Sequence, residues 1–243
     1  MRTSLDKKET AELFSHIADS YDLLNHLLSF NLDRRWRGKL AKLAGSRPGA
    51  LVLDLCTGTG DVALRLAQKD AKQVIGIDMS DRMLHLNRAK AARAGLRSKE
   101  ALLKADALNL PFKANVFDGV TVGFGLRNLP ERDRAVSEMA RVLKKGGWCL
   151  VLEFSLPRNW LFSRIYHLYL RRVIPLLGGL LSRSREAYEY LYASILEFSR
   201  LDVLALMEAA GLSGLSCTRL SGGLVSLYQG KKEDDGTLLS HCS

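Results

Sequence analysis

The sequence has few cysteines, and none of them are clustered. Its 243 residues contain four, and no two stand at the spacing of a metal-binding pair: Cys56, Cys149, Cys217 and Cys242. Paired cysteines are typical of disulfide frameworks and structural zinc sites. We therefore expect no metal site, no disulfide and a reducing compartment.

Long apolar runs are also missing. The N-terminus has no apolar core of the kind that a signal peptide carries. The most apolar region, residues 160–181, is interrupted by Arg164, His167, Arg171 and Arg172, unlike a membrane span. These absences predict a protein that stays in the cytoplasm.

Proline is scarce as well, and no Gly/Ser/Pro-rich linker divides the chain. A chain of this length that is 47% hydrophobic can bury one large core. We predict one domain over residues 1–230, with N-terminal helices in residues 1–45 and a disordered tail from 231 to 243. The net charge of +10 favours an anionic partner, either nucleic acid or an anionic membrane surface.

Residues 51–61 read Leu-Val-Leu-Asp-Leu-Cys-Thr-Gly-Thr-Gly-Asp, an apolar run followed by a glycine pair. The run predicts a buried parallel strand, and the apolar periodicity after it predicts a helix. Gly58 and Gly60 would let a ligand approach the backbone N–H groups where that helix begins. The spacing to Ala63 also fits a dinucleotide fingerprint, which alone is a weak signal.

Acidic residues at three successive strand ends help to decide between a nicotinamide dinucleotide and S-adenosylmethionine as the cofactor. Asp54, four residues before Gly58, would repel a pyrophosphate but attract a cationic cofactor. Asp78 ends the second strand and can accept hydrogen bonds from ribose hydroxyls, in nicotinamide and S-adenosylmethionine (SAM) sites alike. Asp106 and Ala107 follow the third strand and would place a carboxylate and a backbone N–H beside adenine. Together they predict a SAM site, although Asp78 alone would also suit a helix cap and Asp106 a turn.

The alternation of apolar runs and helical patterns predicts an α/β fold. We expect a seven-stranded, mostly parallel sheet with one antiparallel edge strand and helices on both faces, the Rossmann-like class I methyltransferase arrangement. A Gly222-Gly223 turn makes the last two strands a hairpin. The expected strands are 51–55, 73–78, 101–105, 119–124, 148–154, 215–220 and 224–229.

Residues 155–198 interrupt this alternation with aromatic and basic residues. We interpret them as a helical insert over the active site, with a membrane-surface contact as a second role. The aromatic and basic residues expected at the bilayer are Trp160, Phe162, Tyr166, Tyr169, Arg164, Arg171 and Arg172. Packing of the same aromatics on the sheet is the alternative.

Arg127 and Asn128 follow the fourth strand, where side chains should face the reacting methyl group. We predict that both contact the substrate. The alternative is structural, with Arg127 paired to a buried acid and Asn128 capping the next helix.

Several longer segments resemble one family of enzymes. They are Phe14-x-x-Ile17-Ala18-x-x-Tyr21-Asp22-x-x-Asn25, Ser29-Phe30, Trp36-Arg37, the loop from Leu53 to Asp61, Gly123-Phe124-Gly125-Leu126-Arg127-Asn128, and Leu150-Val151-Leu152-Glu153-Phe154-Ser155. They are similar to the ubiquinone/menaquinone biosynthesis C-methyltransferases over about residues 10–230.

The resemblance implies methyl transfer from SAM to a ring carbon of a polyprenylated quinol, most typically demethylmenaquinol or a ubiquinone-precursor benzoquinol. It implies cofactor contacts at Thr59, Asp78, Asp106 and Ala107. Where relatives often have a serine, this chain has Gly123, so only a backbone contact remains there. The insoluble substrate implies a peripheral position at the membrane. A homodimer is possible.

A quinol carbon becomes nucleophilic when the neighbouring hydroxyl loses its proton. Arg127 would stabilise the resulting phenolate and Asn128 would orient its oxygen. Tyr21 would accept the proton if Arg127 lowers its pKa, and His26 and Asp22 are rival bases.

Two other functions remain open at this point. A methyltransferase acting on RNA, or on another small aromatic substrate, would use the same cofactor site. However, the sequence has no RNA-binding module, so we expect no nucleic-acid partner. A scaffold that binds SAM without turnover is the second alternative.

Overall fold

The structure is a computed structural model that describes residues 7–45, 48–69, 71–173 and 185–233. Its strands are β1 (Leu51–Leu55), β2 (Gln73–Asp78), β3 (Glu100–Lys104), β4 (Phe117–Gly123), β5 (Leu143–Phe154), β6 (Leu212–Leu220) and β7 (Val225–Lys232). Its α-helices are α1 (Lys7–Leu28), α2 (Leu32–Ala44), α3 (Asp61–Gln68), α4 (Asp81–Arg93), α5 (Arg132–Val142), α6 (Trp160–Leu168), α8 (Arg185–Phe198) and α9 (Val203–Ala209). Short helical turns are η1 (Leu126–Asn128), η2 (Tyr169–Val173) and η3 (Ser221–Gly223).

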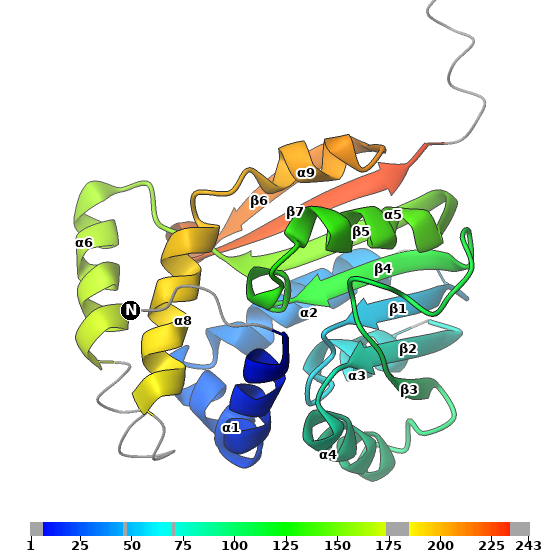
Figure 1. The fold of residues 1–243 in the computed structure, drawn as a ribbon, viewed down its shortest axis with the longest axis horizontal. Helices are drawn as coiled ribbons and strands as arrows, with labels where there is room; N and C mark the ends of the chain where they lie inside the picture. Colours follow the sequence, from blue (N-terminus) through cyan, green and yellow to red (C-terminus); the bar gives the residue numbers. More distant parts are fainter. Residues whose placement is uncertain (1–6, 46–47, 70, 174–184, 234–243) are drawn as a thin grey trace, which may run out of the picture.

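The strands form one seven-stranded sheet in the order β3-β2-β1-β4-β5-β7-β6 (Figure 1). The strands from β3 to β5 pair parallel, and β7 runs antiparallel between β5 and β6. The predicted mixed sheet with antiparallel pairing toward one edge is therefore confirmed. The chain order reverses between β1 and β4, and open α/β sheets bind ligands at such a switch point.

Helices cover both faces of the sheet, as predicted. One face packs against α5 and α9, whose Met139 and Met207 are fully buried. The other face packs against α2 and α3 through Leu40 and Leu66. Each helix presents an apolar stripe to the sheet, and burial of that stripe is what fixes the helices in place.

The C-terminal strand is longer than predicted. Lys231 and Lys232 pair with β6, so the prediction that a tail begins at residue 231 is wrong. The Lys232 Nζ donates to the carbonyl oxygens of Ala140 and Leu143 at 2.8 and 3.0 Å, where an ammonium suits the C-terminal end of α5. The rest of the predicted disordered tail, residues 234–243, lies outside the described residues.

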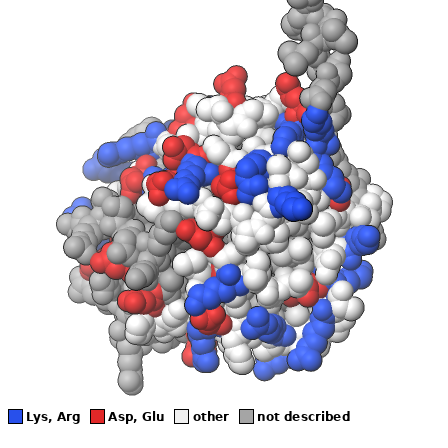
Figure 2. Space-filling model, turned by 45° about the vertical axis from the view of Figure 1, so that its right-hand side comes forward, with Lys and Arg blue, Asp and Glu red and all other residues white. Residues whose placement is uncertain are grey.

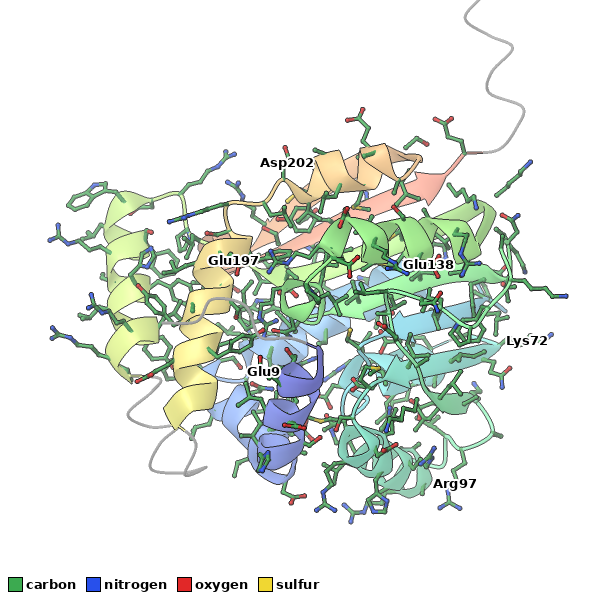
Figure 3. All side chains as sticks on the ribbon, in the orientation of Figure 1. Glu9, Lys72, Arg97, Glu138, Glu197 and Asp202 are labelled. Carbon is green, nitrogen blue, oxygen red and sulfur yellow. The ribbon has the colours of Figure 1, made fainter. Side chains whose placement is uncertain are left out.

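A layer of helices covers the carboxyl ends of the parallel strands. Helices α1, α6 and α8 and the turn η2 share an apolar cluster that includes Ile17, Tyr166, Leu170 and Ile195 (Figure 1). At the C-terminal end of α8, Glu197 accepts a hydrogen bond from Arg132 of α5 at 2.8 Å (Figure 3). Nowhere in the described ranges does a helix have the length and hydropathy to cross a bilayer.

Candidate active site

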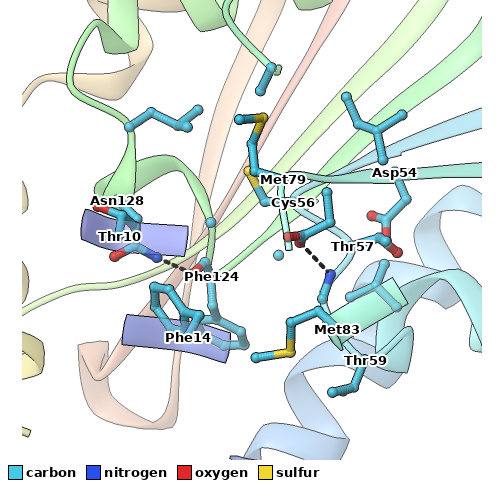
Figure 4. A pocket seen from close by; sticks show the side chains of 18 of the residues that line it. Thr10, Phe14, Asp54, Cys56, Thr57, Thr59, Met79, Met83, Phe124 and Asn128 are labelled. Carbon is cyan, nitrogen blue, oxygen red and sulfur yellow. Dashed lines mark hydrogen bonds between the residues drawn. The ribbon is translucent and has the colours of Figure 1, made fainter. Parts of the chain in front are cut away.

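A cavity opens at the carboxyl ends of β1 to β4, and we call it the first cavity. It holds about 1020 Å³ of empty space, its open mouth included. Asn128 and Phe14 lie on one side of it, and Asp54 and Thr59 lie on the other (Figure 4). The predicted cofactor residues that line it are Asp54, Gly58, Thr59, Asp78, Asp106, Ala107 and Gly123.

The backbone conformation of the glycine loop requires glycine at both positions. Gly58 and Gly60 have φ angles of 55° and 90°, which residues with a Cβ rarely adopt. At Gly60 a Cβ would lie 2.1 Å from the Oδ1 of Asn87, a fully buried residue of α4. Gly60 is not among the described residues that line the cavity, so its contribution is to let Asn87 pack directly beneath the loop.

Asp54 is buried and held by two hydroxyl groups. The Oγ1 atoms of Thr57 and Thr121 donate to its carboxylate at 2.7 and 2.6 Å. Burial raises the pKa of Asp54 to about 6, although both hydroxyls lower it. A buried carboxylate of this kind favours a cationic group in the cavity.

Asp78 and Asp106 are held by backbone groups at the neighbouring strand ends. The N–H groups of Gly58 and Ser80 each donate to Asp78 at 2.9 Å, which ties the end of β2 to the glycine loop. The N–H of Leu108 donates to Asp106 at 2.9 Å. Each carboxylate is thus oriented by the backbone at the end of its strand.

Thr59 connects the glycine loop to the first helix. Its hydroxyl donates to Asp22 Oδ1 at 2.5 Å and accepts from Lys90 Nζ at 3.0 Å. Lys90 also pairs with Asp22, and it lies 2.9 Å from Asp61. The Thr59 hydroxyl is thus engaged on both sides, by Asp22 and by Lys90.

A second cavity adjoins the first one. It holds about 660 Å³ of empty space, its open mouth included, and Leu13, Ile17 and Leu191 give it an apolar wall. Phe14, Tyr21, Arg37 and Phe124 line both cavities. Two ligands that occupy the two cavities would therefore meet at these shared residues.

Arg127 lies in the wall of the second cavity, and its side chain is paired. It is 4% exposed, and its guanidinium lies 3.1 Å from the fully buried carboxylate of Glu153. The same guanidinium donates to the Phe124 carbonyl oxygen. The structural acid anticipated as an alternative thus exists and compensates the charge. The Arg127 Nε, however, has no hydrogen-bond partner among the described residues although it is buried.

Asn128 is oriented from two sides. Its Nδ2 donates to the Phe124 carbonyl oxygen at 3.4 Å, and the Tyr190 hydroxyl donates to its Oδ1 at 3.3 Å. The side chain lines the first cavity. Asn128 precedes α5, whose N-cap is Glu131, so the alternative prediction of a helix cap is wrong.

The predicted base is not supported by its pKa. Burial raises the pKa of Tyr21 more than Arg127 and Arg37 lower it. The phenol is therefore protonated at neutral pH, and the expectation that Arg127 makes Tyr21 a ready proton acceptor is wrong. His26 and Asp22, the rival bases, are engaged with Asp33 and Thr59, and neither is among the described residues that line the two cavities.

His26, Asp33 and Asp61 place ligand-type atoms within 4.8 Å of one another. A guanidinium already lies among these groups, because Arg37 pairs with Asp33 and lies 3.8 Å from Asp61. Burial opposes ionisation, yet Arg37 lowers the pKa of both carboxyl groups. Lys90 also lies 2.9 Å from Asp61, so two basic side chains face the two carboxylates of this cluster.

Sequence patterns missed two residues of the site. Tyr190 lines the second cavity from α8, and Arg37 lines both cavities from α2. The Trp36-Arg37 pair stands out in the sequence only through the family resemblance, and Tyr190 is one of many aromatics in the insert. Arg37 falls on the same face of α2 as Trp36 and Leu40, whereas Arg34 and Arg35 are exposed, and a basic residue at the spacing of the buried face would have been the usable signal.

Comparison with protein families gives one match over nearly the whole chain. Residues 2–232 match the model described as the ubiE/COQ5 methyltransferase family. A Geobacter sulfurreducens protein named ubiquinone/menaquinone biosynthesis C-methyltransferase UbiE is 43% identical over 224 residues, 91% of this chain and 87% of that protein. A Staphylococcus aureus demethylmenaquinone methyltransferase is 39% identical over 235 residues, 96% of each chain.

Solved structures show the same fold. A Thermotoga maritima SAM-dependent methyltransferase, possibly acting on histamine according to its description, superposes with a TM-score of 0.62 at 22% identity and covers 92% of this chain and 100% of its own. A Methanococcus maripaludis protein described as a putative SAM-dependent methyltransferase gives a TM-score of 0.66 at 17% identity, covering 98% and 99%. At these identities the similarity establishes the class I methyltransferase fold.

Proposed function

The chain belongs to the ubiE/COQ5 methyltransferase family, and we propose that it transfers the SAM methyl group to a ring carbon of a polyprenylated quinol in quinone biosynthesis. The relatives' names favour demethylmenaquinol, with the ubiquinone-precursor benzoquinol as the other nucleus of the family. The cofactor is SAM, as in the methyltransferases that share this fold.

One observation of the site carries the proposal, namely that an apolar cavity opens directly onto the cofactor cavity. The first cavity has four carboxylates and suits a cationic cofactor, whereas the second has an apolar wall that suits an aromatic ring and the start of a prenyl chain. The shared residues Phe14, Tyr21, Arg37 and Phe124 mark where methyl donor and acceptor would meet. Holding the two reactants in line accounts for much of the acceleration.

The reaction balances without a further reactant. The quinol hydroxyl loses a proton, and the electron pair of the phenolate makes the neighbouring ring carbon nucleophilic. That carbon forms a bond to the methyl carbon while the bond from methyl to sulfur breaks, and neutral S-adenosylhomocysteine leaves. The ring carbon then loses its proton, which restores the aromatic ring.

We assign the polar residues at the junction to the developing phenolate. The Nε–H of Arg127, which has no hydrogen-bond partner among the described residues, is a buried donor in the wall of the second cavity, and it suits an oxyanion there. Asn128, whose amide is oriented by Phe124 and Tyr190, would face the substrate from the first cavity. Tyr21, protonated at neutral pH, would donate to the substrate or relay its proton, with solvent as the final acceptor.

RNA methylation is the alternative that the charge of the chain suggested. On the face that Figure 2 shows, acidic side chains lie among the Lys and Arg residues, so this face presents no continuous basic stripe for a phosphate backbone. The test is a transfer assay with tritiated SAM, in which quinol extract and bulk RNA are offered separately. We expect label in the quinol fraction alone, and label in the RNA fraction would refute the assignment.

We further propose that the enzyme collects its substrate at an anionic membrane surface. Each buried methylene of a prenyl chain is worth about 0.8 kcal/mol, so such a chain leaves a bilayer only at high cost. On α6 the apolar side chains Trp160, Leu161, Ile165 and Leu168 are 72%, 53%, 57% and 53% exposed. In Figure 3 several side chains of α6 extend away from the domain.

The composition of this surface differs from the expected one. Tyr166 is buried, and the Tyr169 hydroxyl donates to the Leu28 carbonyl oxygen at 2.6 Å, so these two tyrosines pack within the helical layer. Trp160 and the aliphatic residues of α6 take the interfacial role instead. Arg164, Arg171 and Arg172 are exposed, and each basic residue contributes about 1 kcal/mol near anionic lipid.

A further inference from the structure

Acidic side chains outnumber basic ones in the lining of the first cavity. Asp54, Asp61, Asp78 and Asp106 line it with carboxylates, and Arg37 is the one Lys or Arg among its described lining residues. SAM carries a sulfonium, an ammonium and a carboxylate. The acids account for the two cationic groups, but they repel the SAM carboxylate, so a cation is the lining group that would hold it most strongly.

Arg37 lies on the side of the first cavity where the methionine part of SAM, which carries the carboxylate, would extend. With adenine at Asp106 and ribose at Asp78, the nucleoside lies over β3 and β2, and the methionine part must extend across β1 toward β4. Arg37 lies on that side. Its guanidinium is 5.1 Å from the ring centre of Phe124, directly after β4, and 3.8 Å from Asp61 at the start of α3.

We propose that Arg37 binds the carboxylate of the methionine part of SAM and thereby distinguishes SAM from analogues that lack this group. The inference rests on SAM as the cofactor of the proposed reaction. It adds a cofactor-binding role to a residue of α2, a helix that otherwise covers the sheet.

The guanidinium is held in place before any cofactor binds. Arg37 is 6% exposed and pairs with Asp33, whose carboxylate also accepts from Ser29 at 2.8 Å. Next to it, the Trp36 Nε1 donates to the Ser221 hydroxyl at 2.9 Å, which fixes α2 against the β6–β7 turn. A donor that needs no reorganisation loses little entropy on binding.

A purely structural role is the competing explanation. In that case Arg37 only compensates Asp33, and its loss would affect every ligand of the first cavity equally. The two explanations differ in what they predict for an analogue without the carboxylate.

The first arm of the experiment measures calorimetric affinities of the unmodified protein for SAM and for decarboxylated SAM. The decarboxylated compound carries one more net positive charge, so an acidic cavity without a carboxylate-binding group should hold it at least as tightly as SAM. If Arg37 binds the carboxylate, SAM should bind about 10- to 100-fold more tightly, as for a hydrogen-bonded charge pair. Equal or tighter binding of the decarboxylated compound overturns the proposal, whether or not any variant folds.

The second arm repeats both titrations with variants of α2. Arg37→Gln should lose about 10- to 100-fold in SAM affinity and change the affinity for decarboxylated SAM by less than about threefold. Arg37→Lys, which keeps the charge, should retain part of the preference. Arg35→Gln removes the same charge from an exposed position of the helix and should leave both affinities unchanged.

Equal loss of both affinities in Arg37→Gln would assign Arg37 the structural role. Because neither arm includes a methyl acceptor, these outcomes are separate from the proposed reaction. A protein that prefers SAM through Arg37 but methylates no quinol would refute the proposed function and leave this inference standing.

Discussion

The Thr59 hydroxyl donates to the Asp22 carboxylate at 2.5 Å, and this hydrogen bond joins the glycine loop to the first helix. Lys90 of α4 pairs with the same carboxylate. Helix α1 also lines the first cavity through Thr10, Phe14 and Tyr21. A cofactor that enters or leaves by way of α1 must therefore disturb this contact.

Asp22→Ala should increase the dissociation rate of SAM by about 10-fold, the equivalent of one net hydrogen bond, because α1 is then held less firmly. Stopped-flow displacement measures this rate. Asp19→Ala is the matched control, since Asp19 pairs with Arg82 at the surface of the same helix, and such pairs contribute little. Equal dissociation rates in the two variants would mean that α1 does not restrain the cofactor.

Asp78→Ala should weaken SAM binding by about 1.5–3 kcal/mol, because a charged acceptor for the ribose is lost. Calorimetry measures this directly. The exposed Asp81→Ala serves as control, since it removes the same charge three residues away in a surface pair with Lys104. A folded Asp78→Ala protein with the SAM affinity of the parent would exclude the ribose contact.

SAM binding should depend on pH through Asp54, whose pKa burial raises to about 6. The cationic groups of SAM favour the ionised carboxylate, so affinity should increase as pH rises from about 5 to about 7, with proton release near pH 6. Calorimetry in buffers of different ionisation enthalpy measures that release. An Asp54→Asn protein that still releases the proton would show that another group titrates.

Stability of the ligand-free protein has the opposite dependence on pH. The folded pKa of Asp54 lies above the ordinary value of 3.8, so folding disfavours its ionised form. The contribution of Asp54 to stability is therefore full below pH 3.8 and is lost as pH rises through about 6.

Arg127→Ala should lower the free energy of unfolding by about 3–5 kcal/mol, because it leaves the Glu153 carboxylate buried and unpaired. The double variant Arg127→Ala/Glu153→Gln should regain part of that loss. If the Arg127 Nε contacts the phenolate, turnover per folded molecule should remain low in both variants. Recovery of full turnover in the double variant would reduce Arg127 to a structural counter-ion.

The protein should float with vesicles that contain anionic lipid and should be released by high salt. Replacing Arg164, Arg171 and Arg172 together by Gln should weaken flotation without unfolding the domain. The matched control replaces three exposed arginines in and after α4 by Gln, namely Arg88, Arg93 and Arg97. If both triple variants float equally, the region of α6 is not the membrane contact.

The carboxylates of the first cavity could be predicted from sequence because their positions follow from the strand pattern alone. Asp54, Asp78 and Asp106 each follow a parallel strand, and parallel strands of one sheet end at the same edge. That rule brings distant carboxylates together without knowledge of any side-chain packing. The same rule correctly predicted that Arg127 and Asn128 lie at the carboxyl end of β4.

The partners of those two residues could not be predicted. Glu153 reaches Arg127 only because β4 and β5 pair in one particular register, interrupted by a shift between Phe117 and Gly119. Tyr190 reaches Asn128 only because α8 packs against α1 and η1. The direction of the pKa shift of Tyr21 could not be predicted for a related reason. Burial raises this pKa by more than the nearby Arg127 and Arg37 lower it.

The position of the transferred methyl group tests the central claim most directly. SAM with a deuterated methyl group is incubated with the protein and reduced demethylmenaquinone in vesicles, and the product is analysed by mass spectrometry and NMR. We predict one deuterated methyl group on a ring carbon of the naphthoquinol, with S-adenosylhomocysteine formed in equal amount. A deuterated methyl ether on oxygen, or an unlabelled quinol with a protein that binds SAM, would contradict the account.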